Sequence, residues 1–129
     1  MKIDHLAIWV DDLENMKAFY LKYFETTSGE RYTNEKKQYT SYFIYFGEDK
    51  TRLELMHQTS ITDIAGQRGF AKGLAHFSIS VGGKEKVNKL TEWLRADSYI
   101  IFSEPRTTGD GYYESVVLDP EGNYLEITA

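Results

Sequence analysis

Residues 118–127 have the sequence Leu118-Asp-Pro-Glu-Gly-Asn-Tyr-Leu-Glu-Ile127. The segment Asp119-Pro120-Glu121-Gly122 predicts a tight turn, because proline presets φ at the second turn position and glycine tolerates a positive φ. Residues 124–128 then predict a strand in which Glu126 lies on the face opposite its two aliphatic neighbours. A buried carboxylate without a partner costs several kcal/mol. We therefore expect Glu126 to face a partner.

A near-copy of this strand occurs earlier in the chain, at Leu53-Glu54-Leu55. Each of the two glutamates follows a histidine at nearly the same distance: His5 lies 49 positions before Glu54, and His76 lies 50 positions before Glu126. The sequence around each histidine also matches in register. A repeat of roughly 60 residues predicts a duplicated fold module rather than a solenoid.

The composition excludes several classes of protein. The chain has 129 residues, which predicts one domain, and its 41% hydrophobic and 15% aromatic content excludes disorder. A net charge of −5 argues against a nucleic-acid-binding surface. No apolar run is long enough to span a membrane, and the first residues do not resemble a signal peptide. We therefore expect a cytoplasmic protein that binds neither nucleic acid nor membrane.

The chain contains no cysteine. Disulfides, thiolate metal ligands and a cysteine nucleophile are therefore excluded together. Any metal ion that the chain binds must take histidine and carboxylate ligands.

The hydrophobic pattern predicts the same element order, βαβββ, in both modules, and an α+β fold. In the first module (residues 1–58) we expect strands at 3–10, 30–33, 39–46 and 52–56. A helix begins after Asp11-Asp12, with Glu14 in a capping-box-like position, and residues 26–29 end it. Its apolar stripe consists of Leu13, Met16, Phe19, Tyr20, Tyr23 and Phe24.

The second module (residues 73–129) repeats this plan. We expect strands at 74–81, 99–102, 112–118 and 124–128, and a helix at 84–95. Residues 104–111 predict a glycine-rich loop that carries Arg106. Residues 59–72 separate the modules; a plain connector is favoured there, and a mobile flap is the alternative.

In both modules the histidine and the glutamate fall on the strand face opposite the aliphatic residues expected to pack on the helix. Two such modules facing each other would bring together His5, Glu54, His76 and Glu126. Two imidazole nitrogens and two carboxylates suit a divalent ion of the Zn, Ni, Co, Fe or Mn group, and they suit Cu(I) poorly. An octahedral ion held in this way keeps two adjacent positions open for a chelating substrate.

Simpler interpretations exist for each of these residues taken singly. His5 alone fits a hydrogen-bonded strand histidine, and Glu54 alone fits a salt-bridged residue at a sheet edge. The repetition of both at matched spacing favours the metal site. His57 is adjacent to Met56 and faces away from Glu54, so we expect a structural or exposed side chain there.

The repeated His…Leu-Glu-aliphatic pattern, with Asp119-Pro-Glu-Gly-Asn123 before its second copy, resembles the vicinal oxygen chelate superfamily over the whole chain. Within that superfamily the ligand order is most similar to glyoxalase I of the small bacterial type. The resemblance implies tandem βαβββ modules that form a curved mixed sheet with helices on its outer face. It also implies a homodimer and one divalent metal per site, held by His5, Glu54, His76 and Glu126.

The resemblance further implies the activity of a lyase or isomerase on a small molecule. A hemithioacetal of a 2-oxoaldehyde would chelate the metal through its two oxygens. Glu126 would remove the carbon-bound proton, and a carboxylate would return a proton to the neighbouring carbon of the enediolate. Glu54 would be the second carboxylate ligand and partner base.

The chain departs from the glyoxalase I pattern at two positions. Small enzymes of that family commonly hold glutathione with an arginine four residues after the first histidine and an asparagine four residues after the first glutamate. Here these positions are Trp9 and Gln58. We expect Trp9, Gln58 and Arg106 to contact the substrate, and Trp9 favours a more apolar or aromatic molecule. The thiol, the aldehyde and the metal are left open.

Other members of the superfamily provide the alternatives. An extradiol dioxygenase and a fosfomycin-type thiol transferase should use three ligands, which leaves Glu54 surplus. An epimerase of the methylmalonyl-CoA kind commonly has glutamine at that position. A metal-free drug-binding protein of the bleomycin-resistance type would fit Trp9 and the tyrosines, but those proteins lack the ligand set.

Overall fold

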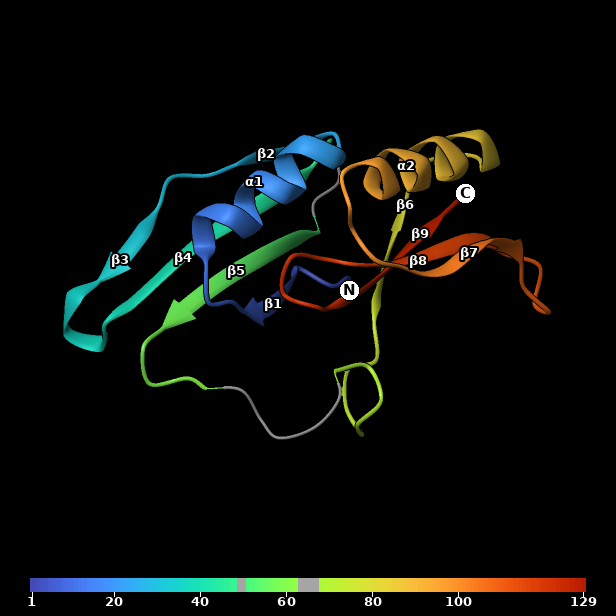
Figure 1. The fold of residues 1–129 in the computed structure, drawn as a ribbon. Coiled ribbons are helices and arrows are strands. Elements are labelled where there is room, and N and C mark those ends of the chain that lie inside the picture. Colours follow the sequence, from blue (N-terminus) through green and yellow to red (C-terminus); the bar gives the residue numbers. More distant parts are fainter. Residues whose placement is uncertain (49–50, 63–67) are drawn as a thin grey trace. The chain divides into compact units, whose positions relative to one another are not determined.

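The computed structural model of the protein describes residues 1–48, 51–62 and 68–129 (Figure 1). The chain divides into two compact units, Met1–Ile64 and Ala65–Ala129. Each unit has one α-helix and its own mixed β-sheet, so the predicted α+β fold of tandem βαβββ modules is confirmed.

The first unit contains a five-stranded sheet with the order β1-β5-β4-β2, in which β3 also pairs with β4. The first and last strands of the unit, β1 and β5, run parallel, and the other pairs are antiparallel. The elements are β1 (His5–Trp9), α1 (Leu13–Tyr23), β2 (Thr26–Ser28), β3 (Tyr32–Asn34), a 3₁₀ turn (Glu35–Lys37), β4 (Tyr39–Phe46) and β5 (Arg52–Gln58).

Helix α1 is capped by Asp12, whose side chain accepts a hydrogen bond of 2.9 Å from the backbone N–H of Asn15. The predicted capping box built on Asp11 and Glu14 is therefore wrong. Glu14 instead forms an ion pair of 2.7 Å with Lys17 and accepts a hydrogen bond from Tyr42 on the sheet. The predicted apolar stripe is confirmed, since all of its members are buried: Leu13, Met16, Phe19, Tyr20, Tyr23 and Phe24.

The second strand of this unit differs from the prediction. The sequence predicts that residues 26–29 end the helix, but α1 ends at Tyr23, and residues 26–28 form β2 against the last residues of β4. The Thr26 hydroxyl donates at 2.8 Å to the Tyr20 carbonyl, which also accepts from the Phe24 N–H, so β2 is attached to the end of the helix. At Gly29, a Cβ atom would lie 3.3 Å from the Tyr45 hydroxyl. Residues 29–31 interrupt the strand, and pairing with β4 resumes at β3.

The second unit contains a four-stranded sheet with the order β6-β9-β8-β7, in which β6 and β9 run parallel. The predicted turn before β9 is confirmed. The Gly122 N–H donates to the Asp119 carbonyl at 3.0 Å, and Gly122 has a φ of 79°. The elements are β6 (Phe77–Ser80), α2 (Lys84–Ala96), β7 (Ile101–Thr107), β8 (Tyr113–Leu118) and β9 (Tyr124–Thr128).

Strand β7 is longer than predicted. The expected loop at 104–111 is wrong at its start, because β7 continues to Thr107 and carries Arg106 opposite Glu114 on β8. Pro105 is tolerated within this strand because β7 lies at the sheet edge, where an N–H donor can be missing. Two register shifts between β7 and β8 accompany it.

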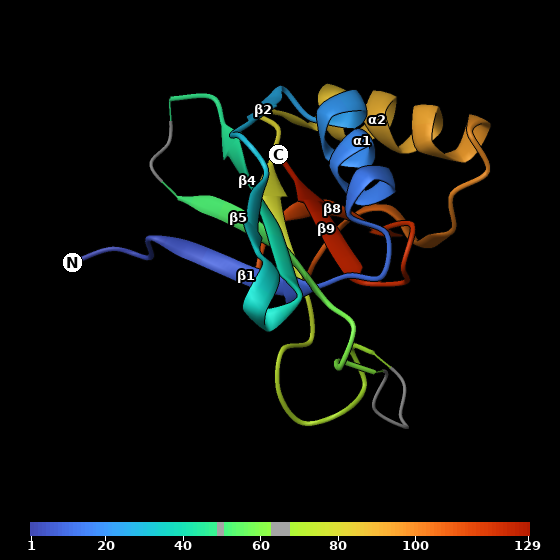
Figure 2. The ribbon, with the colours of Figure 1, turned by 90° about the vertical axis from the view of Figure 1, so that its left-hand side faces the viewer.

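Each helix covers one face of its own sheet (Figures 1 and 2): α1 packs on β2, β4 and β5, and α2 packs on β7, β8 and β9. The apolar residues of the central strands point toward the helix and are fully buried, including Ile44 and Leu55 in the first unit and Leu125 and Ile127 in the second. The residues predicted to bind a metal lie on the opposite face of each sheet.

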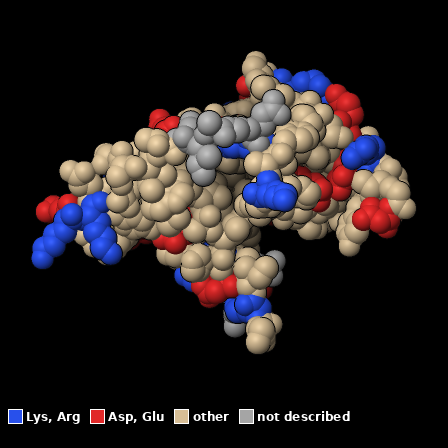
Figure 3. Space-filling model, turned by 90° about the horizontal axis from the view of Figure 1, so that it is seen from below, with Lys and Arg blue, Asp and Glu red and all other residues tan. Residues whose placement is uncertain are grey.

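Charged side chains of both signs are interspersed on the face seen in Figure 3. Exposed ion pairs occur along α2, such as Lys89–Glu85 at 2.8 Å. Such a pair contributes at most about 1 kcal/mol to stability.

Among the residues that the structure describes, no helix is long and apolar enough to cross a membrane.

Candidate active site

The first unit brings His5 and Glu54 together. His5 lies on β1 and Glu54 on β5, and the parallel register places Ala7 beside Glu54, so that all three residues share the face opposite α1. The His5 Nε2 atom lies 3.8 Å from Glu54 Oε2. The imidazole is 39% exposed and the carboxylate 14% exposed. The two predicted ligands of the first module are therefore neighbours with an open side.

The orientation of His5 is fixed by Asp4, which the sequence analysis did not identify. The His5 Nδ1–H donates to Asp4 Oδ2 at 2.9 Å, so Nε2 is turned toward Glu54. Arg52 contacts the same Asp4 oxygen, and its guanidinium lies 4.4 Å from the Phe43 ring centre. The hydrogen bonds from His5 and then Arg52 lower the pKa of Asp4. A carboxylate that accepts from the far nitrogen is the usual partner of a metal-binding histidine.

Tyr39 orients the Glu54 carboxylate in a similar way. Its hydroxyl donates to Glu54 Oε1 at 2.9 Å, while Oε2 faces His5. Burial raises the pKa of Tyr39, and the Glu54 charge adds to this effect, so the hydroxyl remains a donor. The sequence pattern placed Tyr39 on a strand but could not show that its side chain reaches Glu54, because Tyr39 is paired with Gln58 and not with Glu54.

Trp9 and Gln58, the predicted substrate contacts of the first module, lie on the same sheet face as Glu54. Trp9 is 39% exposed and makes an edge-to-face contact with Tyr39 at 6.1 Å between ring centres. The Gln58 amide donates to the Ser60 hydroxyl at 2.9 Å. His57, in contrast, donates from Nδ1 to the Val10 carbonyl at 2.9 Å, which confirms its structural role.

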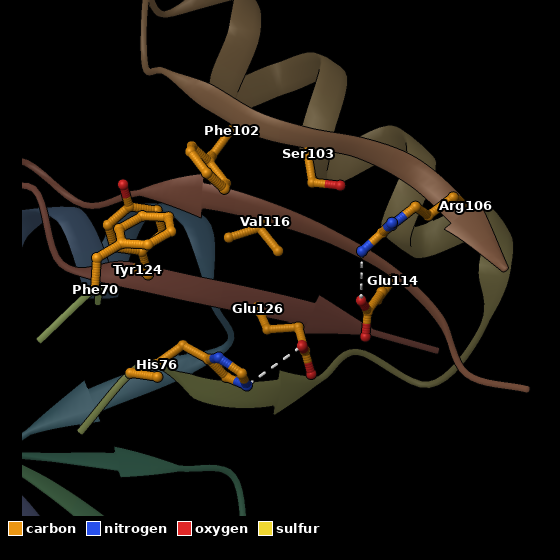
Figure 4. A pocket seen from close by; sticks show the side chains of 10 residues that line it. Phe70, His76, Phe102, Ser103, Arg106, Glu114, Val116, Tyr124 and Glu126 are labelled. Atoms are coloured by element: carbon orange, nitrogen blue, oxygen red, sulfur yellow. Dashed lines mark ion pairs between the residues drawn. The ribbon is translucent and has the colours of Figure 1, made fainter. Parts of the chain in front are cut away.

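The second unit brings His76 and Glu126 together (Figure 4). His76 Nε2 lies 3.4 Å from Glu126 Oε2, with the imidazole 48% and the carboxylate 16% exposed. The strand expected at 74–81 is shorter than predicted, and His76 immediately precedes β6. The residue before it is Ala75, so this histidine has no counterpart of Asp4. The two His–Glu pairs therefore differ in what holds the imidazole.

A second carboxyl group, Glu114 on β8, lies beside Glu126. Glu114 is 8% exposed, and its Oε1 atom is 3.7 Å from Arg106 Nη2. Burial first, and the neighbouring Glu126 carboxylate second, raise the pKa of Glu114. Glu114 therefore retains its proton to a higher pH than an exposed glutamate. The sequence analysis missed it, although its alternation with Val116 and Leu118 marks the face on which it lies.

These residues line a cavity of about 390 Å³ in the second unit (Figure 4). The predicted residues His76, Glu126 and Arg106 all lie in its wall. The sequence analysis missed the aromatic part of this wall. The full lining consists of Phe70, Ala75, His76, Phe102, Ser103, Arg106, Glu114, Val116, Tyr124 and Glu126.

The donor chemistry of both pairs suits a divalent metal. Among the residues that the structure describes, no three or more histidine or carboxylate side chains form a group that could hold a metal ion. Each unit has one neighbouring imidazole and carboxylate. Nitrogen and oxygen donors of this kind suit Zn, Ni, Co, Fe and Mn. The partly exposed imidazoles and the hydrogen-bonded His5 suit coordination of such an ion in chemical type.

Solved structures similar to this chain include several glyoxalases. Maize glyoxalase I matches with a TM-score of 0.78 and 22% identity, over 98% of this chain and 44% of the maize chain. The trypanothione-dependent glyoxalase I of Leishmania major matches with a TM-score of 0.73 and 23% identity, over 99% and 86% of the two chains. A glyoxylase/bleomycin resistance protein/dioxygenase domain from Frankia sp. EAN1pec matches with a TM-score of 0.82 and 16% identity, over 99% of this chain and 96% of the Frankia chain.

At these identities the structural likeness shows the fold alone, and this chain spans less than half the length of the maize enzyme. No curated protein sequence matches the chain. The family model of the glyoxalase/bleomycin resistance protein/dioxygenase superfamily, however, matches residues 2–127. This match covers nearly the whole chain, including both His–Glu pairs. The chain therefore belongs to the glyoxalase/bleomycin resistance protein/dioxygenase superfamily.

Proposed function

We propose that this protein is a metal-dependent lyase or isomerase of the glyoxalase I type, which acts on a hemithioacetal or a related chelating small molecule. The observation that carries this proposal is the repeated His–Glu pair, at 3.8 Å in the first unit and 3.4 Å in the second, on the sheet face opposite the helix. Membership of the superfamily supports it. The proposed ligands of one divalent ion (Ni, Co, Zn, Mn or Fe) are His5, Glu54, His76 and Glu126.

A divalent ion held by these residues would stabilise negative charge on substrate oxygens. Asp4 and Tyr39 keep the first His–Glu pair oriented through hydrogen bonds of 2.9 Å each. Glu126 is the proposed base: its carboxylate lines the cavity and can accept a carbon-bound proton from a molecule held there. Glu54 is the proposed second carboxylate, able to return a proton. A homodimer and a cytoplasmic location remain predictions from the sequence.

Metal content tests the proposal most directly. We expect near-stoichiometric divalent metal in protein purified without a metal-affinity tag, measured by elemental mass spectrometry. His76→Ala and Glu126→Ala should lose it, because each removes one proposed ligand. Glu85→Ala is the matched control, since Glu85 is exposed on α2 and pairs with Lys89. Absence of metal from the native protein, even after reconstitution, would contradict the proposal.

A second candidate function is metal-free binding of a small aromatic molecule, as in bleomycin-resistance proteins. The aromatic wall of the cavity favours it: the Phe102 and Tyr124 ring centres lie 4.8 Å apart there. This function does not require the His–Glu pairs. The metal measurement therefore separates the two candidates.

Replacing Asp4 with asparagine is expected to weaken metal binding by about 10- to 100-fold, because a carboxylate behind a metal-binding histidine fixes its ring and raises its basicity. Competition with a chelator measures the affinity. Asp4 is exposed, so the fold should be unaffected. Asp11→Asn, a nearby exposed aspartate, is the control. Unchanged affinity in Asp4→Asn would show that Asp4 does not position His5 for a metal.

A further inference from the structure

We infer that the cavity of the second unit selects an aromatic group, so that the substrate of the proposed reaction is an aryl-bearing chelating molecule, such as an adduct of an aryl 2-oxoaldehyde. This inference rests on the proposed function, because the His76–Glu126 pair in the same cavity is what would act on the substrate. The aromatic selectivity itself is argued from three rings, Phe70, Phe102 and Tyr124, which we call the aromatic corner.

The three rings of the aromatic corner contact one another. Phe102 and Tyr124 are edge-to-face at 4.8 Å between ring centres, Phe70 and Tyr124 at 5.5 Å, and Phe70 and Phe102 at 5.9 Å. Phe70 nevertheless remains 64% exposed and Phe102 51% exposed. Covering this exposed apolar surface with an apolar group has a favourable free energy, because the surface is removed from water. Aromatic rings favour another ring in edge-to-face or offset contact. A planar ligand group would meet both conditions.

Phe70 is held in place by its two preceding residues. The Arg68 guanidinium donates to the Glu121 carbonyl at 2.9 Å and to Asn123 Oδ1 at 3.1 Å, which attaches the segment to the turn before β9. A Cβ atom on Gly69 would lie 2.6 Å from the Tyr124 ring, and the φ of Gly69 is +79°, so this close approach requires glycine. Because the corner is built before any ligand arrives, binding loses little entropy in ordering it.

The cavity has a polar end opposite the aromatic corner. Figure 4 shows Phe70, Phe102 and Tyr124 at one end, Arg106 and Glu114 at the other, and Val116 between them. The His76–Glu126 pair lies along one side. A ligand with its ring in the corner therefore extends its polar group along the cavity beside Glu126.

The size of the cavity limits the ligand. Its volume of about 390 Å³ lies near the lower end of the range of roughly 300–1,000 Å³ found for small-molecule sites. This volume accommodates one aromatic ring with a short polar chain. The large remainder of a peptide thiol would extend outside it.

Paired probes test the selectivity. Phenylglyoxylate and pyruvate both present a 2-keto carboxylate and differ by a phenyl ring in place of a methyl group, so isothermal titration of both isolates the contribution of the ring. We expect phenylglyoxylate to bind about tenfold or more tightly than pyruvate, in metal-free and in metal-loaded protein. In Phe102→Ala this ratio should fall by about threefold or more. Phe102→Tyr should largely restore it.

Tyr112→Ala is the matched control, because Tyr112 is 61% exposed in the same unit but does not line the cavity. It should leave the ratio unchanged. Equal affinity for the two probes, undetectable binding of phenylglyoxylate, or an unchanged ratio in Phe102→Ala would each overturn the inference. Circular dichroism confirms that the variants are folded.

Metal content and turnover of aliphatic and aryl hemithioacetals, measured beside the titrations, separate this inference from the proposed function. A protein that binds no metal yet prefers phenylglyoxylate would contradict the proposed reaction and retain the aromatic corner. A protein that binds metal and converts aliphatic and aryl hemithioacetals equally well would contradict the aromatic selectivity alone.

Discussion

Replacing Glu126 with glutamine is expected to lower kcat/KM for a hemithioacetal by about 10²–10⁴-fold, the usual contribution of a general base. Glutamine has the same size and fills the same position between the buried Leu125 and Ile127, but its amide cannot accept the proton. Initial rates of the metal-loaded protein measure the effect.

The interpretation of this variant requires its metal content, because Glu126 is also a proposed ligand. We expect Glu126→Gln to retain metal or bind it more weakly, with the loss of rate persisting at saturating metal. Glu85→Gln, on the exposed face of α2, should keep the native rate. Full activity in metal-loaded Glu126→Gln would show that another group removes the proton.

Replacing Leu125 with alanine is expected to lower the free energy of unfolding by about 2–5 kcal/mol, as is typical of a leucine deleted from a packed core. Leu125 is fully buried in β9, on the face that α2 covers. Its loss removes apolar contacts and leaves a cavity behind the strand that carries Glu126. Denaturant unfolding followed by circular dichroism measures the change.

Leu74→Ala is the matched control, because this leucine of the same unit is 58% exposed. It should change the free energy of unfolding by no more than about 0.5 kcal/mol. Equal effects of the two substitutions would mean that the side chain of Leu125 is not packed as described.

Much of the fold could be predicted because strong local signals specify it. The aromatic-rich segment 39–46 and the proline–glycine turn before 124–128 give strands whose bounds match β4 and β9. Strands β2 and β7 were misjudged because their sequences, Thr-Thr-Ser and a segment with Pro105, have weak patterns. They are strands because they pair with β4 and β8, and such long-range pairing is not visible in a local pattern.

The candidate site could be predicted only where the sequence repeats itself. The matched spacing of histidine and glutamate identified both His–Glu pairs. The imidazole nitrogen and the carboxylate oxygen lie 3.8 Å apart in the first pair and 3.4 Å apart in the second. Tyr39 and Glu114 escaped notice because neither lies directly across from its glutamate. The strand register sets Phe43 beside Glu54 and Val116 beside Glu126, whereas Tyr39 pairs with Gln58 and Glu114 with Thr128. Their contacts depend on where their long side chains extend, which alternation does not give.

In both units the histidine belongs to the first strand or immediately precedes it, and the glutamate lies on the last strand, with the two strands paired in parallel. Residues that are partners in these two parallel strands are roughly 48 positions apart in the sequence. Closing so long a loop costs more entropy than forming the hairpin of β8 and β9, so contacts of this separation slow folding. During refolding, the hairpins should gain amide protection before the first strand docks. We therefore expect the His–Glu pair of each unit to form late in folding, after its hairpins.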